Sequence, residues 1–353
     1  MRRSLASLAI GVGLALLAPG VLWLVASAQG PAVPAWVSDA QVYAAAKKEG
    51  AVVHYCTLPQ AYCEDIGKRF EKHTGIKADI TRLSSGPQYS RLMQEHQAGL
   101  KVTDVFEIAL VAAAVEMRTK GMLEPYLPRD AAKIDARFRE KDRLYNEYYV
   151  NVQFIAYNPK HISAADAPKR WKDIYDPRWK GKLTISHPKF SGITIDWLLW
   201  QTKLFGGWDI LQRLKANDPI IVRSSAESIP MLINGERPLN AQSYSDSAWE
   251  AKLRGEPIEI SYPEEGVVVS HDYTGILKTA PHPNAAKVFV DYLFSLEHAQ
   301  WLVDHYVYVT HPGVKAPSGF RPLRELKTLI LDADEIARET QNVRDRFSAV
   351  FGG

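Results

Sequence analysis

The sequence predicts an α/β protein folded as two lobes joined by a hinge. The chain has 353 residues, more than the roughly 250 to 300 at which a single hydrophobic core stops growing. Strand-like and helix-like segments alternate along most of it, which is typical of mixed, mainly parallel sheets flanked by helices. A long β-rich run over 147–157 interrupts this alternation and suits a chain crossing between lobes.

The N-terminal half alternates regularly between the two kinds of segment. We expect Ser38 to cap a first helix that runs through Lys48, and Gly75 to end a second helix. After the first helix, the expected strands and helices cover 52–55, 62–73, 77–83, 88–98 and 104–108.

A second α/β unit follows the β-rich run. Its expected strands and helices cover 183–186, 194–204, 220–223, 225–234, 238–242, 258–261 and 267–270. The chain is expected to cross back near Ser270. The predicted domains are a first lobe of 36–150 plus 270–311 and a second lobe of 151–269 plus 312–353.

The N-terminus has the features of a secretory signal peptide over residues 1–28. Arg2 and Arg3 precede an apolar stretch that ends in Ala26-Ser27-Ala28, a small-residue cleavage site. An uncleaved anchor is the alternative, because this stretch approaches the roughly 20 residues that cross a bilayer. Cleavage would give an exported, periplasmic protein.

Composition and motifs narrow the function classes. The 43 Lys and Arg residues nearly balance 40 Asp and Glu, and no basic run occurs, which argues against nucleic acid as a partner. Gly-x-Ser-x-Gly, His-Glu-x-x-His and Gly-x-x-x-x-Gly-Lys motifs are all missing. We therefore expect no catalysis and no cofactor, with a periplasmic hydrolase as the alternative.

The two cysteines, Cys56 and Cys63, lie close together in the sequence. An oxidising compartment would let them form a disulfide. Two free buried thiols, or half of a metal site, are the alternatives, and the second lacks further cysteines to complete it.

Several motifs resemble the periplasmic solute-binding proteins of ABC importers, in the family-1-like group that includes ferric-iron, polyamine and phosphonate receptors. They occur in the family's order along nearly the whole chain. They are Phe70-Glu71-Lys72-His73-Thr74-Gly75, Ala156-Tyr157-Asn158, Trp171-Lys172-Asp173-Ile174, Trp179-Lys180-Gly181-Lys182, Tyr262-Pro263-Glu264-Glu265-Gly266 and a late segment over 283–300.

The resemblance implies a type II periplasmic-binding-protein fold that closes on a small-molecule ligand between its lobes. It also implies delivery to ABC permease membrane subunits with a cytoplasmic ATPase, and a monomeric receptor. The favoured ligand is an anionic organic solute such as a phosphonate, phosphate ester or carboxylate, with ferric iron as the alternative and a polyamine third.

Loops that follow strands are the candidate ligand contacts, because helix N-termini there offer unpaired N–H groups. Thr57 lies in the loop after the first strand. Ser84, Ser85 and Gly86 form a turn before a helix, although ordinary helix capping needs the same residues. Ser191 and Gly192 occupy the equivalent place in the second lobe, where similar family members contact a phosphoryl or phosphonate group.

Tyr244 and Ser245, in the segment 242–246, complete the candidate set together with Tyr273 beyond the second crossing. Ferric-binding relatives carry two adjacent tyrosines near Tyr244, whereas serines flank it here. Fe(III) requires several anionic oxygen ligands. No metal is therefore favoured, and Tyr244 would be a ligand if iron were bound.

Overall fold

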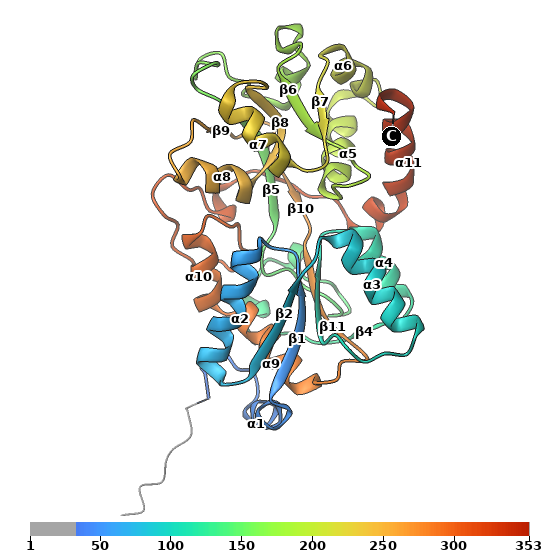
Figure 1. The fold of residues 1–353 in the computed structure, drawn as a ribbon, viewed down its shortest axis with the longest axis vertical. Coiled ribbons are helices and arrows are strands. Elements are labelled where there is room, and N and C mark those ends of the chain that lie inside the picture. The colour runs from blue at the N-terminus through green and yellow to red at the C-terminus, as the bar shows by residue number, and fades with distance from the viewer. Residues whose placement is uncertain (1–32, 353) are drawn as a thin grey trace, which may run out of the picture. The chain divides into compact units, whose positions relative to one another are not determined.

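The computed structural model describes residues 33–352. Its strands form two sheets with helices around both (Figure 1). The expected signal peptide lies outside the described residues. Within 33–352, no helix has both the length and the apolar character needed to cross a bilayer.

The first sheet consists of β1 (Ala51–Cys56), β2 (Lys77–Arg82), β3 (Val105–Ile108), β4 (Leu123–Glu124) and β11 (Tyr273–Leu277). Their spatial order is β2-β1-β3-β11-β4. β1 is parallel to β2 and β3, and β11 is antiparallel to β3 and β4. The carboxyl ends of β1, β2 and β3 therefore share one edge of the sheet.

The second sheet consists of β5 (Asn151–Tyr157), β6 (Leu183–Ser186), β7 (Ile220–Val222), β8 (Leu239–Tyr244), β9 (Glu259–Ser261), β10 (Val267–Ser270) and β12 (Thr328–Leu329). The order is β12-β10-β5-β8-β6-β7, and β9 also pairs with β5. β6 is parallel to β7 and β8, while β5 is antiparallel to β8, β9 and β10. The carboxyl ends of β6, β7 and β8 likewise share one edge.

Six helices directly follow these parallel strands. They are α2 (Gln60–Thr74), α3 (Ser85–Gln97), α4 (Val111–Thr119), α5 (Ile193–Phe205), α7 (Ser225–Asn234) and α8 (Ser245–Leu253). The remaining α-helices are α1 (Ala40–Glu49), α6 (Ile210–Ala216), α9 (Pro283–Leu293), α10 (Leu296–Asp304) and α11 (Ala333–Phe351). α1 packs on α9, and α11 packs on α4, α5 and α6.

Two extended connections join the sheets side by side. In one, Asn146 pairs with Thr274 of β11, and five residues later Asn151 pairs with Ser270 of β10. The other extended connection is the short segment between β10 and β11, and the chain passes once more between the sheets on its way from β11 to β12. This strand hinge and the two mixed sheets confirm the predicted two-lobed α/β fold, whereas the exact lobe boundaries stay a prediction.

The helices that pack on the first sheet explain why α2 forms where the sequence indicated. Phe70 is fully buried, with its ring 4.9 Å from that of Phe289 and 5.7 Å from that of Tyr292. Gly75 ends the helix at φ 64°, in the left-handed region that glycine tolerates best. This packing holds β1 and α2 in place, and with them the loop that carries Thr57.

The structure corrects several element boundaries. The N-cap of α1 is Asp39, whose Oδ1 accepts from Gln41 N at 2.6 Å. Ser38 instead donates from its N and Oγ to Asp291, a largely buried carboxylate that needs such donors. α3 begins at Ser85, three residues earlier than expected, and Gln242–Asp246 is not a loop but the end of β8 and the start of α8.

Candidate functional site

The N-termini of six helices form the edge where the two sheets meet. Among the described residues, the N-cap side chains of α2, α3, α4, α5, α7 and α8 accept no hydrogen bond from the backbone N–H groups of their helices. In contrast, Asp39, Ser295 and Asp332 cap α1, α10 and α11, and the Glu49 carboxylate accepts from the first N–H groups of α9. These helix ends therefore keep positive dipole ends and most of their first N–H donors. The exceptions are Ser247 N in α8, which donates to Asp246 Oδ1 at 2.6 Å, and Ala226 N in α7, which faces the Tyr244 hydroxyl.

The two serine turns lie on either side of one residue, Ala109. Its N–H donates to Ser85 Oγ at 3.0 Å, which holds the start of α3 against the start of α4. Gly192, at the start of α5 beside the second sheet, lies against Ala109. A Cβ atom added at Gly192 would lie 3.3 Å from the Ala109 carbonyl oxygen. Ser84–Gly86 and Ser191–Gly192 are thus brought close together, as two parts of one interface.

Tyr244 ends β8 and is largely enclosed. Burial, and then the neighbouring charge of Asp246, raise the pKa of Tyr244 far above its usual range. Its hydroxyl lies near Ser224 and the backbone N–H of Ala226, at the start of α7. Tyr62 in α2 is close enough to Asp246 and Glu250 in α8 for these charges, after burial, to help raise its pKa to about 12. α2 and α8 therefore also approach each other.

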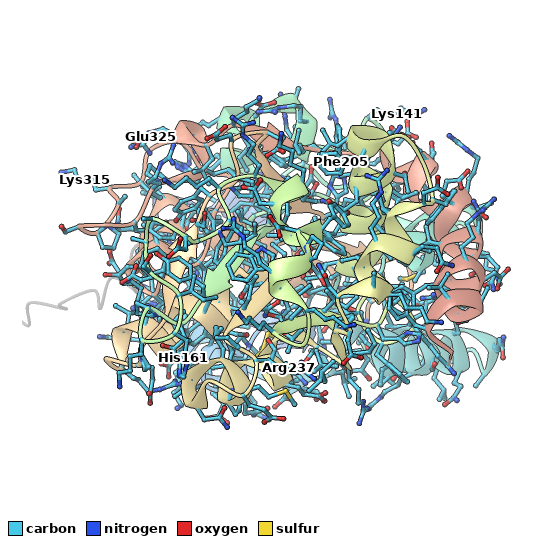
Figure 2. The ribbon with its side chains drawn as sticks, turned by 90° about the horizontal axis from the view of Figure 1, so that it is seen from above. Lys141, His161, Phe205, Arg237, Lys315 and Glu325 are labelled. Atoms are coloured by element: carbon cyan, nitrogen blue, oxygen red, sulfur yellow. A yellow bond between two sulfur atoms is a disulfide. The ribbon has the colours of Figure 1, made fainter. Side chains whose placement is uncertain are left out.

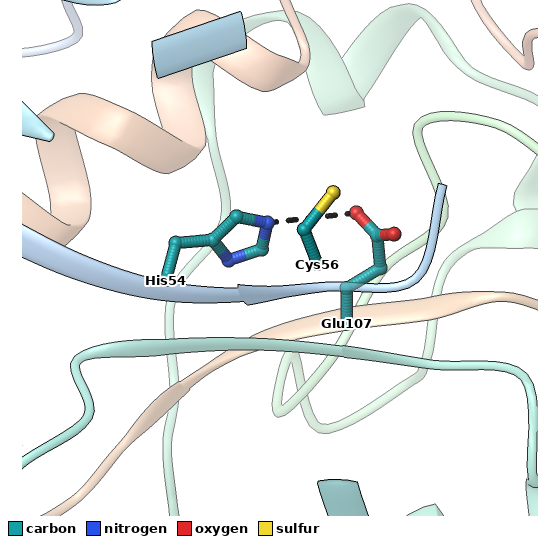
Figure 3. A group of neighbouring side chains, drawn as sticks. All are labelled: His54, Cys56 and Glu107. Atoms are coloured by element: carbon teal, nitrogen blue, oxygen red, sulfur yellow. Dashed lines mark ion pairs between the residues drawn. The ribbon is translucent and has the colours of Figure 1, made fainter. Parts of the chain in front are cut away.

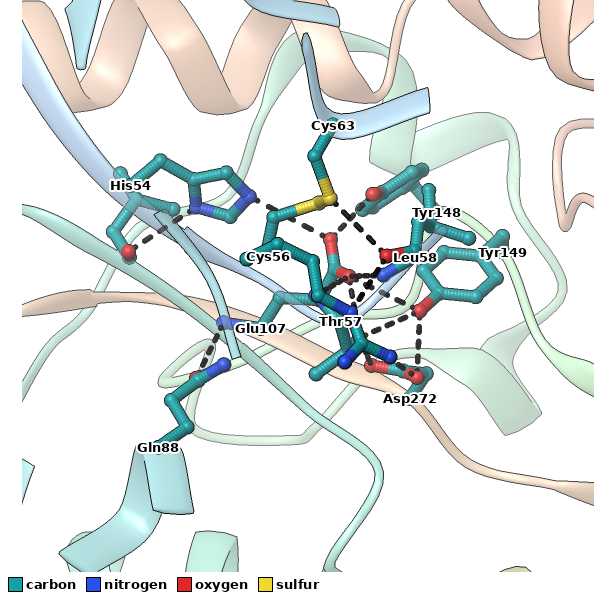
Figure 4. Close-up of polar contacts among 12 residues, drawn as sticks. His54, Cys56, Thr57, Leu58, Cys63, Gln88, Glu107, Tyr148, Tyr149 and Asp272 are labelled. Atoms are coloured by element: carbon teal, nitrogen blue, oxygen red, sulfur yellow. Dashed lines mark hydrogen bonds and ion pairs between the residues drawn. A yellow bond between two sulfur atoms is a disulfide. The ribbon is translucent and has the colours of Figure 1, made fainter. Parts of the chain in front are cut away.

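A buried polar cluster lies beneath these helix ends (Figure 4). Glu107 of β3 accepts hydrogen bonds from Thr57 N at 2.7 Å, from Tyr149 OH at 3.1 Å, and from the hydroxyls of Thr57 and Tyr148. Tyr149 OH is also 2.6 Å from Asp272 Oδ2. The cluster connects β1 and β3 with both hinge connections.

The pKa values of the two carboxyl groups in this cluster shift in opposite directions. Burial acts to raise the pKa of Glu107, but His54, whose Nε2 lies 3.6 Å from Glu107 Oε2, and the Thr57 and Tyr148 hydroxyls hold it below its usual range. Burial, followed by the charge of Glu107, raises the pKa of Asp272 well above its usual range. The two carboxyl groups therefore differ: the pKa of Glu107 lies below its usual range and the pKa of Asp272 lies above it.

The cluster does not form a metal centre. His54, Cys56 and Glu107 lie close enough together to suggest one (Figure 3). However, Cys56 Sγ is bonded to Cys63, with Cα atoms 6.1 Å apart, so no thiolate is available. The predicted disulfide is confirmed, and it ties the end of β1 to the first turn of α2.

Tyr273 lies apart from the serine turns. It is buried, its ring stacks on His271 at 5.2 Å, and it lines a cavity of about 250 Å³ to which none of the other candidate ligand residues contributes. Thr57 also differs from expectation in detail, because its N–H and hydroxyl are occupied by Glu107. Ser245 is buried in the first turn of α8.

Sequence reasoning missed the central role of Glu107 and Asp272. Both are charged residues next to or inside β-rich segments, and that local pattern was the only available indication. Their partners come from 41 to 215 residues away in the chain, which no periodicity could reveal. The uncapped α4 and α7 were also missed as possible donors.

Comparison with known proteins defines the class. The family described as "Bacterial extracellular solute-binding protein" matches residues 103–337. The iron-bound HitA structure from Pseudomonas aeruginosa is similar at 22% identity and a TM-score of 0.73, covering 84% of this chain and 99% of that chain. AfuA from Actinobacillus pleuropneumoniae, with fructose-6-phosphate bound, is similar at 24% identity and a TM-score of 0.74, covering 85% and 98%.

Among curated relatives, the major ferric iron-binding protein of Neisseria meningitidis serogroup B is 22% identical over 338 residues, 91% of this chain and 95% of that protein. The chain belongs to the bacterial extracellular solute-binding protein family, as its resemblances predicted. It is therefore a bacterial extracellular solute-binding protein, and AfuA, whose fold is similar, is described as a periplasmic binding protein.

Proposed function

We propose that this protein captures a small anionic organic solute between its two lobes, with a phosphate ester such as a sugar phosphate as the preferred class. One observation carries the proposal: six helices begin at the inter-sheet edge without side-chain caps, whereas α1, α9, α10 and α11, which begin elsewhere, have carboxylate or serine partners. The short helix α6 is also uncapped but does not begin at this edge. Unpaired N–H groups and helix dipoles suit an anionic group.

The buried carboxylates do not argue for a cationic ligand. Both oxygens of Glu107 already accept hydrogen bonds from within the protein. Burial and the charge of Glu107 raise the pKa of Asp272 well above its usual range, which disfavours its charged form. AfuA, whose fold is similar, was solved with fructose-6-phosphate bound, which makes this compound a suitable first probe.

Titration calorimetry on unfolded and refolded protein, stripped of any ligand, tests the proposal. Fructose-6-phosphate should bind with one site per chain, and fructose, which lacks the phosphate, should bind at least about 100-fold more weakly. Ser191→Ala and Ser85→Ala should each weaken binding about 10-fold, the effect of one hydrogen bond to a charged group. Ser90→Ala, an exposed serine of the same helix α3, is the control and should have no effect.

Equal affinity for fructose and fructose-6-phosphate would contradict the proposal. Release of inorganic phosphate from the bound ester would instead support the periplasmic hydrolase alternative. We propose that no turnover occurs and that the loaded, closed protein docks on the permease subunits in the periplasm.

Ferric iron is the second candidate, because an iron-bound relative shares the fold and Tyr244 lies at the start of α8. Two features oppose it: serines replace a second tyrosine beside Tyr244, and burial makes the Tyr244 phenolate costly. A visible charge-transfer band on adding ferric citrate, abolished by Tyr244→Phe, would establish iron in place of the anionic solute.

A further inference from the structure

An exposed aromatic ring with two cations over it lies at the inter-sheet edge of the second sheet. Phe190 is 57% exposed. The Lys189 Nζ atom lies 5.7 Å from the centre of its ring, and the central carbon of the Arg223 guanidinium lies 5.4 Å from it. Lys189 and Arg223 are themselves exposed, so solvent and solutes can reach both charged groups. We call Lys189, Phe190 and Arg223 the cationic lip.

The cationic lip lies between two of the six uncapped helix starts. Phe190 follows β6 and directly precedes Ser191 and Gly192, the turn at the start of α5. Arg223 directly follows β7 and precedes Ser224, the N-cap residue of α7. β6 and β7 are adjacent parallel strands, so their carboxyl ends share one edge (Figure 1). The lip therefore adjoins the helix ends to which the anionic solute is assigned.

The positive charge of the lip is only partly offset. Within residues 33–352, neither Lys189 nor Arg223 has a carboxylate oxygen within 4.0 Å of its side-chain nitrogens. Glu227 reaches this end of the sheet, where its Oε2 accepts from the Arg223 backbone N–H at 2.9 Å. Arg344 adds a third positive charge, because its Nε donates to the Pro188 carbonyl oxygen at 3.3 Å. In these contacts three cations stand against one carboxylate.

Contacts within the protein do not account for two cations over one ring. At an exposed site a cation–π contact contributes only about 0.5 to 1 kcal/mol. The two like charges repel each other, and salt screens this repulsion only in part at short range. An anionic group between the ammonium and the guanidinium would remove the repulsion and accept charge-assisted hydrogen bonds from both. The lip is therefore suited to an anion.

We propose that the cationic lip binds a second anionic group of the solute. This inference rests on the proposed capture of a phosphate ester, and it narrows the solute to sugar bisphosphates and phosphorylated sugar acids. The first phosphate lies at the uncapped helix ends, and the second phosphate or carboxylate pairs with Arg223 and Lys189. An uncharged sugar end, in contrast, would leave the two cations uncompensated.

Titration calorimetry with two matched pairs of solutes tests the lip. Fructose-1,6-bisphosphate should bind at least about 10-fold more tightly than fructose-6-phosphate, or 6-phosphogluconate at least about 10-fold more tightly than glucose-6-phosphate, as expected for one added charged hydrogen bond. Arg223→Gln and Lys189→Gln should each lower this affinity ratio to less than about 3, because one of the two cations is lost. Their urea midpoints verify that these exposed substitutions leave the fold intact.

Lys315→Gln is the matched control for the loss of one positive charge. Lys315 is exposed beside α10, where Gln300 binds its backbone, and it is labelled in Figure 2. The affinity ratio should keep its value in this variant. The lip proposal is overturned if neither doubly charged solute is preferred, or if the ratio persists in both lip variants. Binding of fructose-6-phosphate without such a preference leaves the proposed function standing, whereas no binding of any phosphate ester overturns both.

Discussion

Glu107 is the residue on which the arrangement beneath the helix ends depends. Its carboxylate accepts from Thr57, Tyr148 and Tyr149 and faces His54, so it fixes the loop after β1 relative to both hinge connections. A charged residue buried in a strand is costly unless it is fully partnered. Its position inside an otherwise apolar strand could be predicted from the sequence, but its partners could not, because they are distant in the chain.

Replacing Glu107 by Ala should lower the free energy of unfolding by about 3 to 5 kcal/mol, because several buried donors and His54 lose their partner. Glu116→Ala, at an exposed position of α4 that pairs with Lys120, should cost less than about 1 kcal/mol. Urea unfolding of both variants provides the comparison. Equal losses would show that the cluster is not a structural centre.

A second single residue, His271, makes the free energy of unfolding depend on pH. Burial opposes its charge, but Glu147 raises the pKa of His271 to about 9. A raised folded-state pKa contributes stability that is complete below the unfolded value near 6.5 and is lost as pH rises towards 9. The unfolding free energy should therefore fall by about 2 to 3 kcal/mol across this window. Glu147→Gln should flatten the profile, and an unchanged slope would contradict this assignment.

At the scale of elements, the sequence predicted where helices and turns lie better than it predicted what these helices and turns do. Gly75 and the serine turns mark boundaries through backbone chemistry that local sequence carries, and β10 and α7 have the predicted bounds. The C-terminal helix α11 was missed, although its buried Ile336, Val343 and Phe347 lie at helical spacing. Which helices lack caps could not be predicted, because Ser84 and Ser224 are residues that usually provide them.

The disulfide between β1 and α2 should stabilise the fold by about 2.5 kcal/mol, the chain-entropy value for so short a loop. Urea unfolding with and without reducing agent measures this contribution. The double variant Cys56→Ser and Cys63→Ser is the control, and reducing agent should leave its midpoint unchanged. An unaffected midpoint in the original protein would show that the bridge adds nothing.

For the whole molecule, the sequence predicted a two-lobed α/β receptor because family motifs and strand–helix alternation extend along the chain. The contact between lobes was not predictable, since it depends on how Gly192 meets Ala109.

Gly192→Ala places a methyl group 3.3 Å from the Ala109 oxygen and should oppose closure. Solute affinity should fall about 10-fold. The ligand-free unfolding midpoint should hardly change, because alanine accepts the φ of −61° found there; a large drop in that midpoint would contradict this.

The central claim is that helix N-termini from both lobes hold the charged group of an anionic solute. A crystal structure of the protein saturated with fructose-6-phosphate tests it directly. We expect phosphate oxygens within about 3 Å of backbone N–H groups at the starts of α3 and α5. A bound molecule whose phosphate lies away from all six uncapped helix ends would contradict the account.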